Sequence, residues 1–525
     1  MLARMNKPFM AGLLSLASLG AVAQGGADQY AATITKEGLK KQLSVIASDE
    51  MQGRETGTEG QRKAAAYIAG QFEQMGLKPA PGTDHYQQYY GVGYDSLTGS
   101  ELVIAGKTYE AGKDYVNETA SNNNGDVKAK KIVFAGYGIG DPKYNDYEGK
   151  DVKGAIVVIF SGEPRQEGNM LITGTRIPSA WGGFQGMAKK LAFAKQQGAK
   201  GVFLLATNLD TMSVAMTRSS LRTRLGVMRG GDASVNSAYI SHAIARSLLG
   251  DDFFADVLAK AKKYEALNTE AQQKKVKINY HFTKQKVSNN ASNVAAYIEG
   301  TDKKDEYVIL TGHYDHLGMR NGKIYYGADD DGSGTCTVLE MAAAFAKAKA
   351  EGHGPRRTVV FMTVSGEEKG LWGSEYYSDH PLFPLEKTSV DLNTDMVGRI
   401  DTERKTGDSL NYVYVIGHDK LSSELQGINE AANDKYTGLV LDYKYDDPKD
   451  PNRIYYRSDH YNFARKGIPI LFFYDGMLKA DYHQPTDTID KIYWDLYEKR
   501  VRMIFHTAWE MANRDAMLKR DIPLN

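Results

Sequence analysis

Histidine and acidic side chains recur in this chain where buried, strand-like runs stop. The apolar run 307–311 reaches Gly312, and His313 and Asp315 follow directly. A loop then leads to three consecutive aspartates, residues 329–331, just before a stretch with apolar residues at helical spacing. Ligands bind at strand ends in open α/β sheets, so these side chains are candidates for a binding site. Imidazole and carboxylate together are ligands suited to zinc.

Three later stretches repeat this placement. Each apolar run is followed by a histidine or an acidic residue: Glu367 and Glu368 after residues 358–364, Asp395 after residues 389–393, and His483 after residues 468–474. The repetition predicts that separate segments contribute to one site at a sheet edge. Because Glu367 and Glu368 are adjacent, we expect different tasks for them: one binds metal and the other takes a proton from water.

Six motifs carry a resemblance to a known family. They are HYDHLG, GADDDGSG, SGEEKGLWGS, NTDMVGR, YRSDHYNF and DYHQPTDT, in family order within residues 288–500, and a weaker match covers 36–80. The chain resembles the co-catalytic zinc aminopeptidases, whose family also holds glutamate carboxypeptidase and glutaminyl cyclase. The resemblance implies an α/β fold: a three-layer, mixed-sheet zinc peptidase domain with helices on both faces.

The resemblance also implies two zinc ions per chain and their ligands. It makes His313 and Asp395 the terminal ligands of one ion, and Glu368 and His483 those of the other. Asp330 is the expected bridging carboxylate, and a cis peptide bond is expected after it. The other two aspartates of the triplet are competing candidates, and an N-capping cluster would explain the triplet by itself.

The remaining site residues follow from the same motifs. Glu367 is the expected general base, and Asp315 is expected to orient the imidazole of His313. Tyr482 could stabilise an oxyanion, Arg457 could contact substrate, and Tyr474 could line the pocket. Arg54, His242 and Cys336 are expected to be structural. Asp459 and His460 are expected to be structural or to support the ligands from behind, and His316 is likewise expected not to bind metal.

The order of motifs predicts an interrupted peptidase domain. The stretches IVFAGYGI, DVKGAIVVIF and AKQQGAKGVFLL resemble a protease-associated domain, which relatives carry as an insertion. We expect it to be β-rich and to limit access to the cleft. The predicted segments are a signal peptide (1–23), the N-terminal part of the peptidase domain (24–110), the inserted domain (111–275) and the catalytic part (276–525).

Composition narrows the class of protein. The chain has 525 residues, with 65 basic and 65 acidic side chains, which argues against a nucleic-acid or polybasic membrane surface. A single cysteine excludes an intrachain disulfide. Arg4, Lys7, an apolar run at 10–19 and small residues at 21–23 predict a signal peptide. We therefore expect an exported protein, periplasmic or extracellular, without stable membrane insertion.

These observations favour an exported zinc aminopeptidase that acts on peptides with a free N-terminus. A carboxypeptidase or dipeptidase of the same fold and a glutaminyl cyclase are alternatives. A catalytically inactive, receptor-like binding protein is a further alternative of a different class. The sequence does not define an oligomeric state.

Overall fold

The computed structural model describes residues 24–183, 185–208, 213–227, 234–267, 272–405 and 407–524. The predicted signal peptide, residues 1–23, lies outside them. The chain divides into two compact units: the first unit is Met1–Gly91 with Asn290–Asn525, and the second unit is Val92–Asn289. No helix among the described residues is long and apolar enough to cross a membrane.

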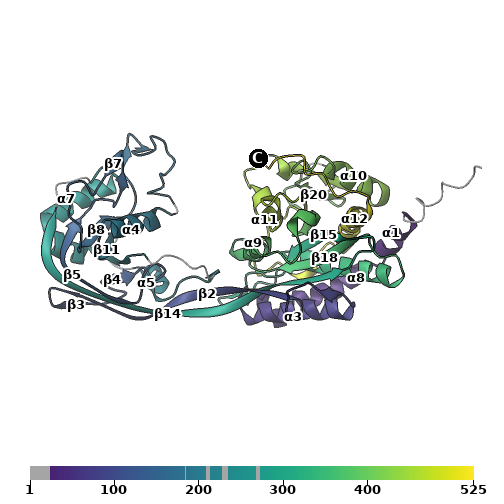
Figure 1. Ribbon diagram of the computed structural model, residues 1–525, viewed down its shortest axis with the longest axis horizontal. Coiled ribbons are helices and arrows are strands. Elements are labelled where there is room, and N and C mark those ends of the chain that lie inside the picture. Colours follow the sequence, from purple (N-terminus) through teal and green to yellow (C-terminus); the bar gives the residue numbers. More distant parts are fainter. Residues whose placement is uncertain are drawn as a thin grey trace, which may run out of the picture. The chain divides into compact units, whose positions relative to one another are not determined.

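The first unit is built on a mixed sheet (Figure 1). Its strand order is β21 (Val440–Asp442), β20 (Tyr412–Ile416), β22 (Ile470–Tyr474), β19 (Thr388–Thr394), β15 (Lys303–His313), β18 (Arg357–Val364) and β14 (Gln273–Ile298). The four strands from β22 to β18 run parallel, while β20 and β14 pair antiparallel at either side of them. All residues of β18 and β19 are buried, as expected for parallel strands covered on both faces.

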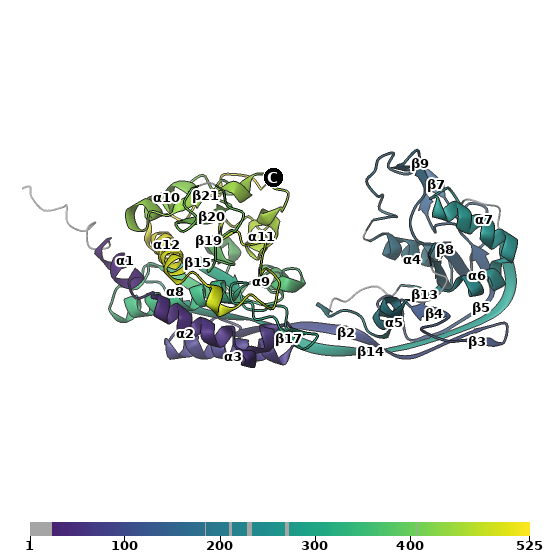
Figure 2. The same ribbon diagram turned by 180° about the vertical axis from the view of Figure 1, so that it is seen from behind.

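Alternation along the strands distributes apolar side chains to two cores. In β15, Val308 and Leu310 join one core, while Ile309 faces the other. The first core is covered by α1 (Gln24–Ala31), α2 (Lys36–Ile46), α3 (Glu59–Gln74), α8 (Gly332–Ala350), α10 (Leu425–Tyr436) and α12 (Trp494–Asn513). The second core is covered by α9 (Trp372–Asp379) and α11 (His460–Ala464). Figure 2 shows α2, α3 and α8 side by side. The predicted three-layer α/β fold is confirmed.

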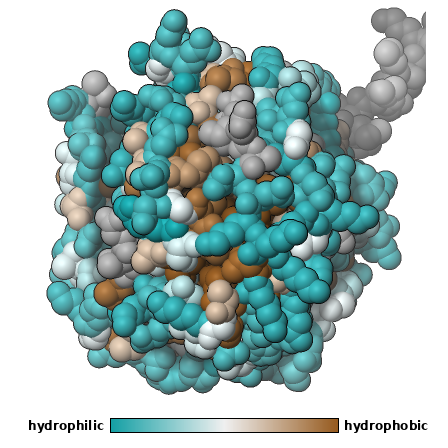
Figure 3. Space-filling view, turned by 90° about the vertical axis from the view of Figure 1, so that its left-hand side faces the viewer, coloured by the Kyte–Doolittle hydropathy of each residue, from teal (hydrophilic) through white to brown (hydrophobic). Residues whose placement is uncertain are grey.

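The second unit is also α/β, and among its described residues strands outweigh helices, in agreement with the expected β-rich character. Four parallel strands form its centre: β5 (Gly125–Phe134), β8 (Ile156–Phe160), β11 (Gly201–Leu205) and β13 (Asn236–Ile240). Helix α4 (Gly186–Gln196) packs on one face, and α6 (His242–Leu249) and α7 (Asp251–Lys262) pack on the other. Figure 3 shows one side of this unit, where hydrophilic side chains surround a central group of hydrophobic ones.

The boundaries between the two units differ from those predicted from the sequence, at residues 110 and 275, and they fall within two long strands. Strand β2 (Gln87–Ile104) contains the boundary at Gly91, and strand β14 contains the boundary at Asn290. The structure divides the chain at Gly91 and Asn290 instead.

Candidate active site

Parallel strands bring the candidate residues to one edge of the sheet. His313 is the last residue of β15, and Asp395 directly follows β19. Glu367 and Glu368 open a 3-10 turn, Glu367–Lys369, three residues after β18 ends. His483 lies in the loop after β22. Because these strands are parallel, their carboxyl ends share an edge, as the apolar runs predict.

Asp330 lies between two histidines. Its Oδ1 is 3.4 Å from Nε2 of His313, and its Oδ2 is 3.1 Å from Nε2 of His483. Each oxygen of the carboxylate thus faces a different imidazole. Among the three aspartates, Asp330 alone is placed to serve two cations at once.

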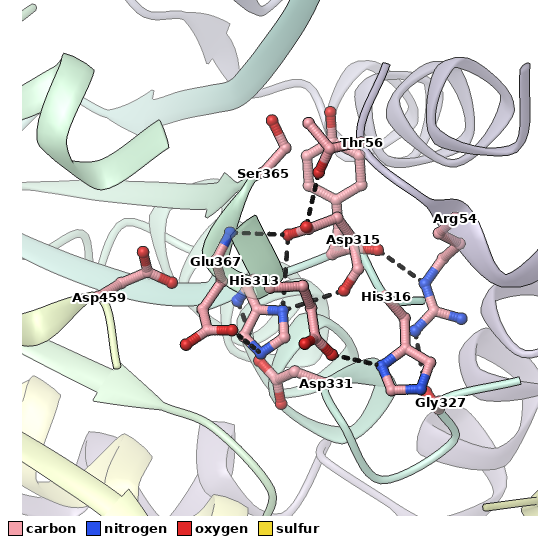
Figure 4. Close-up of polar contacts among 12 residues, drawn as sticks. Arg54, Thr56, His313, Asp315, His316, Gly327, Asp331, Ser365, Glu367 and Asp459 are labelled. Carbon is pink, nitrogen blue, oxygen red and sulfur yellow. Dashed lines mark hydrogen bonds and ion pairs between the residues drawn. The ribbon is translucent and has the colours of Figure 1, made fainter. Parts of the chain in front are cut away.

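The first group of ligating atoms surrounds His313 (Figure 4). Its Nε2 is 3.6 Å from Asp395 Oδ1 and 3.9 Å from Glu367 Oε2. These side chains, together with Asp330 Oδ1, form one cluster of imidazole and carboxylate. His313 is fully enclosed, so its charge state is set by these neighbours rather than by water.

The second group surrounds Glu368. Its Oε2 is 3.2 Å from His483 Nε2, and its Oε1 is 2.9 Å from His316 Nδ1. His316 Nδ1 also lies 3.9 Å from Asp330 Oδ2. The sequence interpretation expected His316 not to bind metal, and the structure places it directly against a predicted ligand. Its spacing of three residues from His313 was the available signal.

Buried polar atoms without a hydrogen bond show that these groups fit metal ions. Within the described residues, several buried atoms make ion-pair contacts but no hydrogen bond of good geometry: His313 Nε2, His316 Nδ1, Asp330 Oδ2 and Glu368 Oε1, while His316 Nε2 has no hydrogen bond either. Leaving such atoms without a hydrogen bond is costly unless something binds them. Two clusters of imidazole and carboxylate sharing one carboxylate are a donor set suited to zinc.

The outer aspartates of the triplet are engaged elsewhere. Asp331 accepts hydrogen bonds from the backbone N–H groups of His313 at 2.9 Å, Gly334 at 2.7 Å and Met396 at 3.0 Å. It therefore caps α8 and fixes two strand ends. Asp329 accepts a 2.8 Å hydrogen bond from the backbone of Gly398. The peptide bond between Asp330 and Asp331 is cis.

Asp487 is a functional neighbour that the sequence interpretation missed. Its carboxylate accepts hydrogen bonds from the backbone N–H of Asp329 and, at 3.1 Å, of Asp330. It holds the backbone of Asp330, the predicted bridging residue, in place. It belongs to the motif DYHQPTDT, but its contact with Asp330, 157 residues earlier, could not be read from the sequence.

Asp315 orients His313 mainly through its backbone. Its carbonyl oxygen is 3.0 Å from Nδ1 of His313, while its carboxylate Oδ1 lies 3.7 Å from that nitrogen. The same carboxylate accepts hydrogen bonds from Thr56 Oγ1 at 2.6 Å and from the backbone N–H of Glu367 at 3.2 Å (Figure 4). Asp315 thereby links the loop of His313 to that of Glu367.

Arg54 is fully buried behind these loops. Its guanidinium donates hydrogen bonds to four backbone carbonyls: Tyr314 at 2.7 Å, Ile46 at 2.8 Å, Tyr326 at 2.6 Å and Gly327 at 2.9 Å. Tyr314 follows His313 directly, and Gly327 precedes the aspartate triplet. Arg54 thus ties together the two segments that carry His313 and Asp330, in agreement with its predicted structural role.

The electrostatics of the two adjacent glutamates differ. Burial raises the pKa of Glu367 well above its usual range, and Asp395 and Glu368 add to that shift while His313 opposes it. Burial and Asp330 would raise the pKa of Glu368, but His316 and His483 outweigh them and lower it to about 2. Glu368 is therefore held as an anion by imidazoles, whereas Glu367 favours holding a proton.

A pocket adjoins these residues. Asp330, Glu367 and Asp395 form its acidic side. The other lining residues are largely apolar or aromatic: Met396, Ile454, Phe472, Tyr474, Leu478 and Tyr482, with Arg457 and Ser458. Arg457 Nη2 donates a 3.0 Å hydrogen bond to the hydroxyl of Tyr482. All three residues predicted to contact substrate therefore line one pocket beside Glu367.

The other residues set aside as structural have internal partners. Asp459 accepts a hydrogen bond from Ser374 Oγ, and His460 Nε2 lies 2.8 Å from the carbonyl of Tyr455. His242 lies 2.8 Å from the carbonyl of Ala206 in the second unit. Cys336 is buried inside α8.

Comparison with known proteins relates this site to a family. The family model "Peptidase family M28" matches residues 293–508, which contain the two metal-ligand groups and the candidate base. Residues 293–508 are thus similar to peptidase family M28. This segment includes the strand edge and the pocket described above.

Two curated relatives match part of the chain, and one solved structure shares its fold. A probable leucine aminopeptidase of Arthroderma otae is 28% identical over 225 residues, covering 42% of this chain and 57% of that protein. A probable zinc metalloprotease of Pyrenophora tritici-repentis is 29% identical over 270 residues, covering 43% and 52%. The chain spans about half the length of these curated relatives. The aminopeptidase from Aneurinibacillus sp. strain AM-1 shares the fold, with a TM-score of 0.50, 21% identity and coverage of 95% of this chain and 98% of that chain.

Proposed function

We propose that this protein is an exported aminopeptidase that binds two zinc ions and removes the N-terminal residue of peptides. The observation that carries the proposal is the position of Asp330, with one carboxylate oxygen 3.4 Å from His313 and the other 3.1 Å from His483. A shared carboxylate between two imidazole–carboxylate groups suits a pair of metal ions. His313 and Asp395 would hold one ion, and Glu368 and His483 the other.

Glu367 is the residue best placed for proton transfer. Bound zinc would supply Lewis-acid polarisation of the scissile carbonyl and acidify the attacking water. Glu367 would accept a proton from that water and deliver it to the leaving amine. Its raised pKa, caused first by burial, suits a group that must hold the proton between these steps. The Tyr482 hydroxyl, held by Arg457, could donate to the oxyanion.

A matched set of peptides tests the direction of cleavage. The set is one peptide with free ends, its N-acetyl form and its C-terminal amide. An aminopeptidase should cleave the free and amidated peptides and leave the acetylated one intact. Mass spectrometry of the products would identify the residue released. Cleavage of all three forms at an internal bond would overturn the exopeptidase proposal.

Arg457 favours one alternative, a carboxypeptidase or dipeptidase. Its guanidinium lines the pocket and could bind the carboxylate of a C-terminal residue. In that case the N-acetyl peptide should be cleaved and the C-terminal amide should resist. Replacing Arg457 with Met would then raise KM for the free and N-acetyl peptides, which both keep a C-terminal carboxylate.

Export and the nature of the second unit complete the proposal. The predicted signal peptide, residues 1–23, supports a periplasmic or extracellular location. The resemblance of the second unit to a protease-associated domain supports a role in restricting substrate size. Comparing short peptides with folded proteins as substrates tests the size restriction. Fractionating cells that express the protein with and without residues 1–23 tests export.

A further inference from the structure

The second unit contains a cavity of its own, about 650 Å³ in volume. The residues after β4 (Tyr115–Asn117) form one wall, and α5 (Val214–Leu221) with the segment after it forms the other. Three arginines line this cavity: Arg218, Arg222 and Arg224. Pockets of this volume hold small organic ligands.

The three guanidiniums are available to a ligand. Each arginine is exposed, and within the described residues none forms an ion pair with a carboxylate at 4.0 Å or less. Arg222 stacks on the ring of Tyr94 at 4.4 Å, which holds its planar group in one orientation. Guanidinium groups bind carboxylates in a planar, two-pronged geometry.

An uncompensated carboxylate lies on the same cavity. Glu118 is partly buried, lines the cavity and has no ion-pair partner among the described residues. Burial raises its pKa, and no neighbouring cation opposes that shift. A half-buried acid without a counter-ion is costly unless a cation binds it.

Glu118 also lines a second cavity, of about 330 Å³, which shares Asn117 and Ser219 with the first. Ser161 follows strand β8 and Asn208 follows strand β11, and both line this second cavity. The cavity therefore lies at the carboxyl ends of parallel strands, the position where open α/β sheets bind ligands. The Ser161 hydroxyl and the Asn208 amide provide neutral hydrogen-bonding groups in the second cavity, whereas the arginines provide positive charge in the first.

We propose that the two cavities form one groove that binds a small zwitterion, an amino acid or a short peptide. Glu118 would bind its ammonium group, and Arg218 and Arg224 would bind its carboxylate. The groove would be a second binding site for the substrates or products of the proposed peptidase. Identifying these ligands with the reaction rests on the proposed function, whereas the groove's affinity for zwitterions does not.

Calorimetric titration of the zinc-loaded protein tests the groove. The probes are L-leucine and triglycine, each also tested with its amine acetylated or its carboxylate amidated. All proteins carry Glu367→Gln so that triglycine is not consumed. The groove variant adds Arg218→Gln and Arg224→Gln, and the matched control adds Arg176→Gln, an exposed arginine of the second unit that lines neither cavity.

We expect the groove variant to lose one class of binding site or to bind at least about tenfold more weakly, since two charge-assisted contacts are removed. The control should bind like its parent, and Glu118→Gln should weaken the free-amine probes but not the acetylated ones. Equal binding by parent and groove variant would overturn the proposal. The same loss in the control, or equal binding of free and amidated probes, would also overturn it. Consumption of triglycine would refute the task of Glu367 and leave the leucine result valid.

Discussion

Replacing Arg54 with methionine tests how the metal-binding loops are held together. The guanidinium makes four hydrogen bonds of 2.6–2.9 Å to carbonyls of separate segments. Hydrogen bonds from a charged donor contribute about 1.5–3 kcal/mol each, so four together exceed about 6 kcal/mol. Removing a buried charge also removes its desolvation cost. We therefore expect the free energy of unfolding to fall by about 3–5 kcal/mol.

The metal site should suffer as well, although Arg54 is not a ligand. Without the guanidinium, the segments of Tyr314 and Gly327 are no longer joined, so His313 and Asp330 are less well oriented. Losing such supporting contacts lowers metal affinity by about 10–100-fold. Arg54→Lys keeps the charge but cannot reach all four carbonyls, so both effects should be smaller than with methionine.

Two measurements check this prediction. Urea unfolding followed by fluorescence reports stability, and competition with a chromogenic chelator reports zinc affinity. The control is Arg62→Met, since Arg62 lies exposed on α3 in a surface ion pair with Glu59. Such a pair contributes about 0–1 kcal/mol. If Arg54→Met unfolded at the wild-type urea concentration and kept its zinc affinity, Arg54 would not hold the two loops together.

Four further predictions concern the site and its surroundings. Glu367→Gln should lower turnover by about 10²–10⁴-fold while zinc content, measured by elemental analysis, stays unchanged; an unaltered rate would remove Glu367 as the base. Glu368→Gln should instead lose zinc, and full retention would reverse the two assignments. A chelator should abolish hydrolysis and zinc should restore it, whereas activity in metal-free protein would exclude the mechanism. Burial lowers the pKa of His460 from 6.5 to about 4. Because the unfolded state then binds a proton at a higher pH than the folded state, this contribution to stability is present above about pH 6.5 and is lost as the pH falls towards 4. That loss should be about 3 kcal/mol, and it should be absent in His460→Gln when urea unfolding is compared at pH 7 and pH 4.5.

Much of the fold could be predicted because its signals are local. Apolar runs such as 358–364 predict buried strands, and helical spacing after Gly332 predicts α8. The second unit was harder, because its strands alternate with short helices among many glycines. Its boundaries were missed because β2 and β14 continue through them, and no residue type marks the point where a continuous strand passes from one core to another.

The choice among three consecutive aspartates was made by tertiary contacts. Residues 329–331 have the same chemistry, and only the resemblance favoured the middle one. In the structure, Asp331 accepts hydrogen bonds from the backbone N–H groups of His313 and Met396, and Asp329 accepts one from that of Gly398. Those donors come from strand ends distant in sequence. Asp330 is left to face both histidines.

The sequence by itself determined which chemistry is available and the segments that carry it. Imidazole or carboxylate follows each apolar run, and two adjacent glutamates, Glu367 and Glu368, allow one to bind metal and the other to accept a proton. Only the tertiary structure decided the partners of those groups. These contacts join residues far apart in the chain: His316 with Glu368, Asp487 with the backbone of Asp330, and Arg54 with the two loops. The physical reason is that hydrogen bonds and ion pairs depend on distance and angle, and long-range packing sets both.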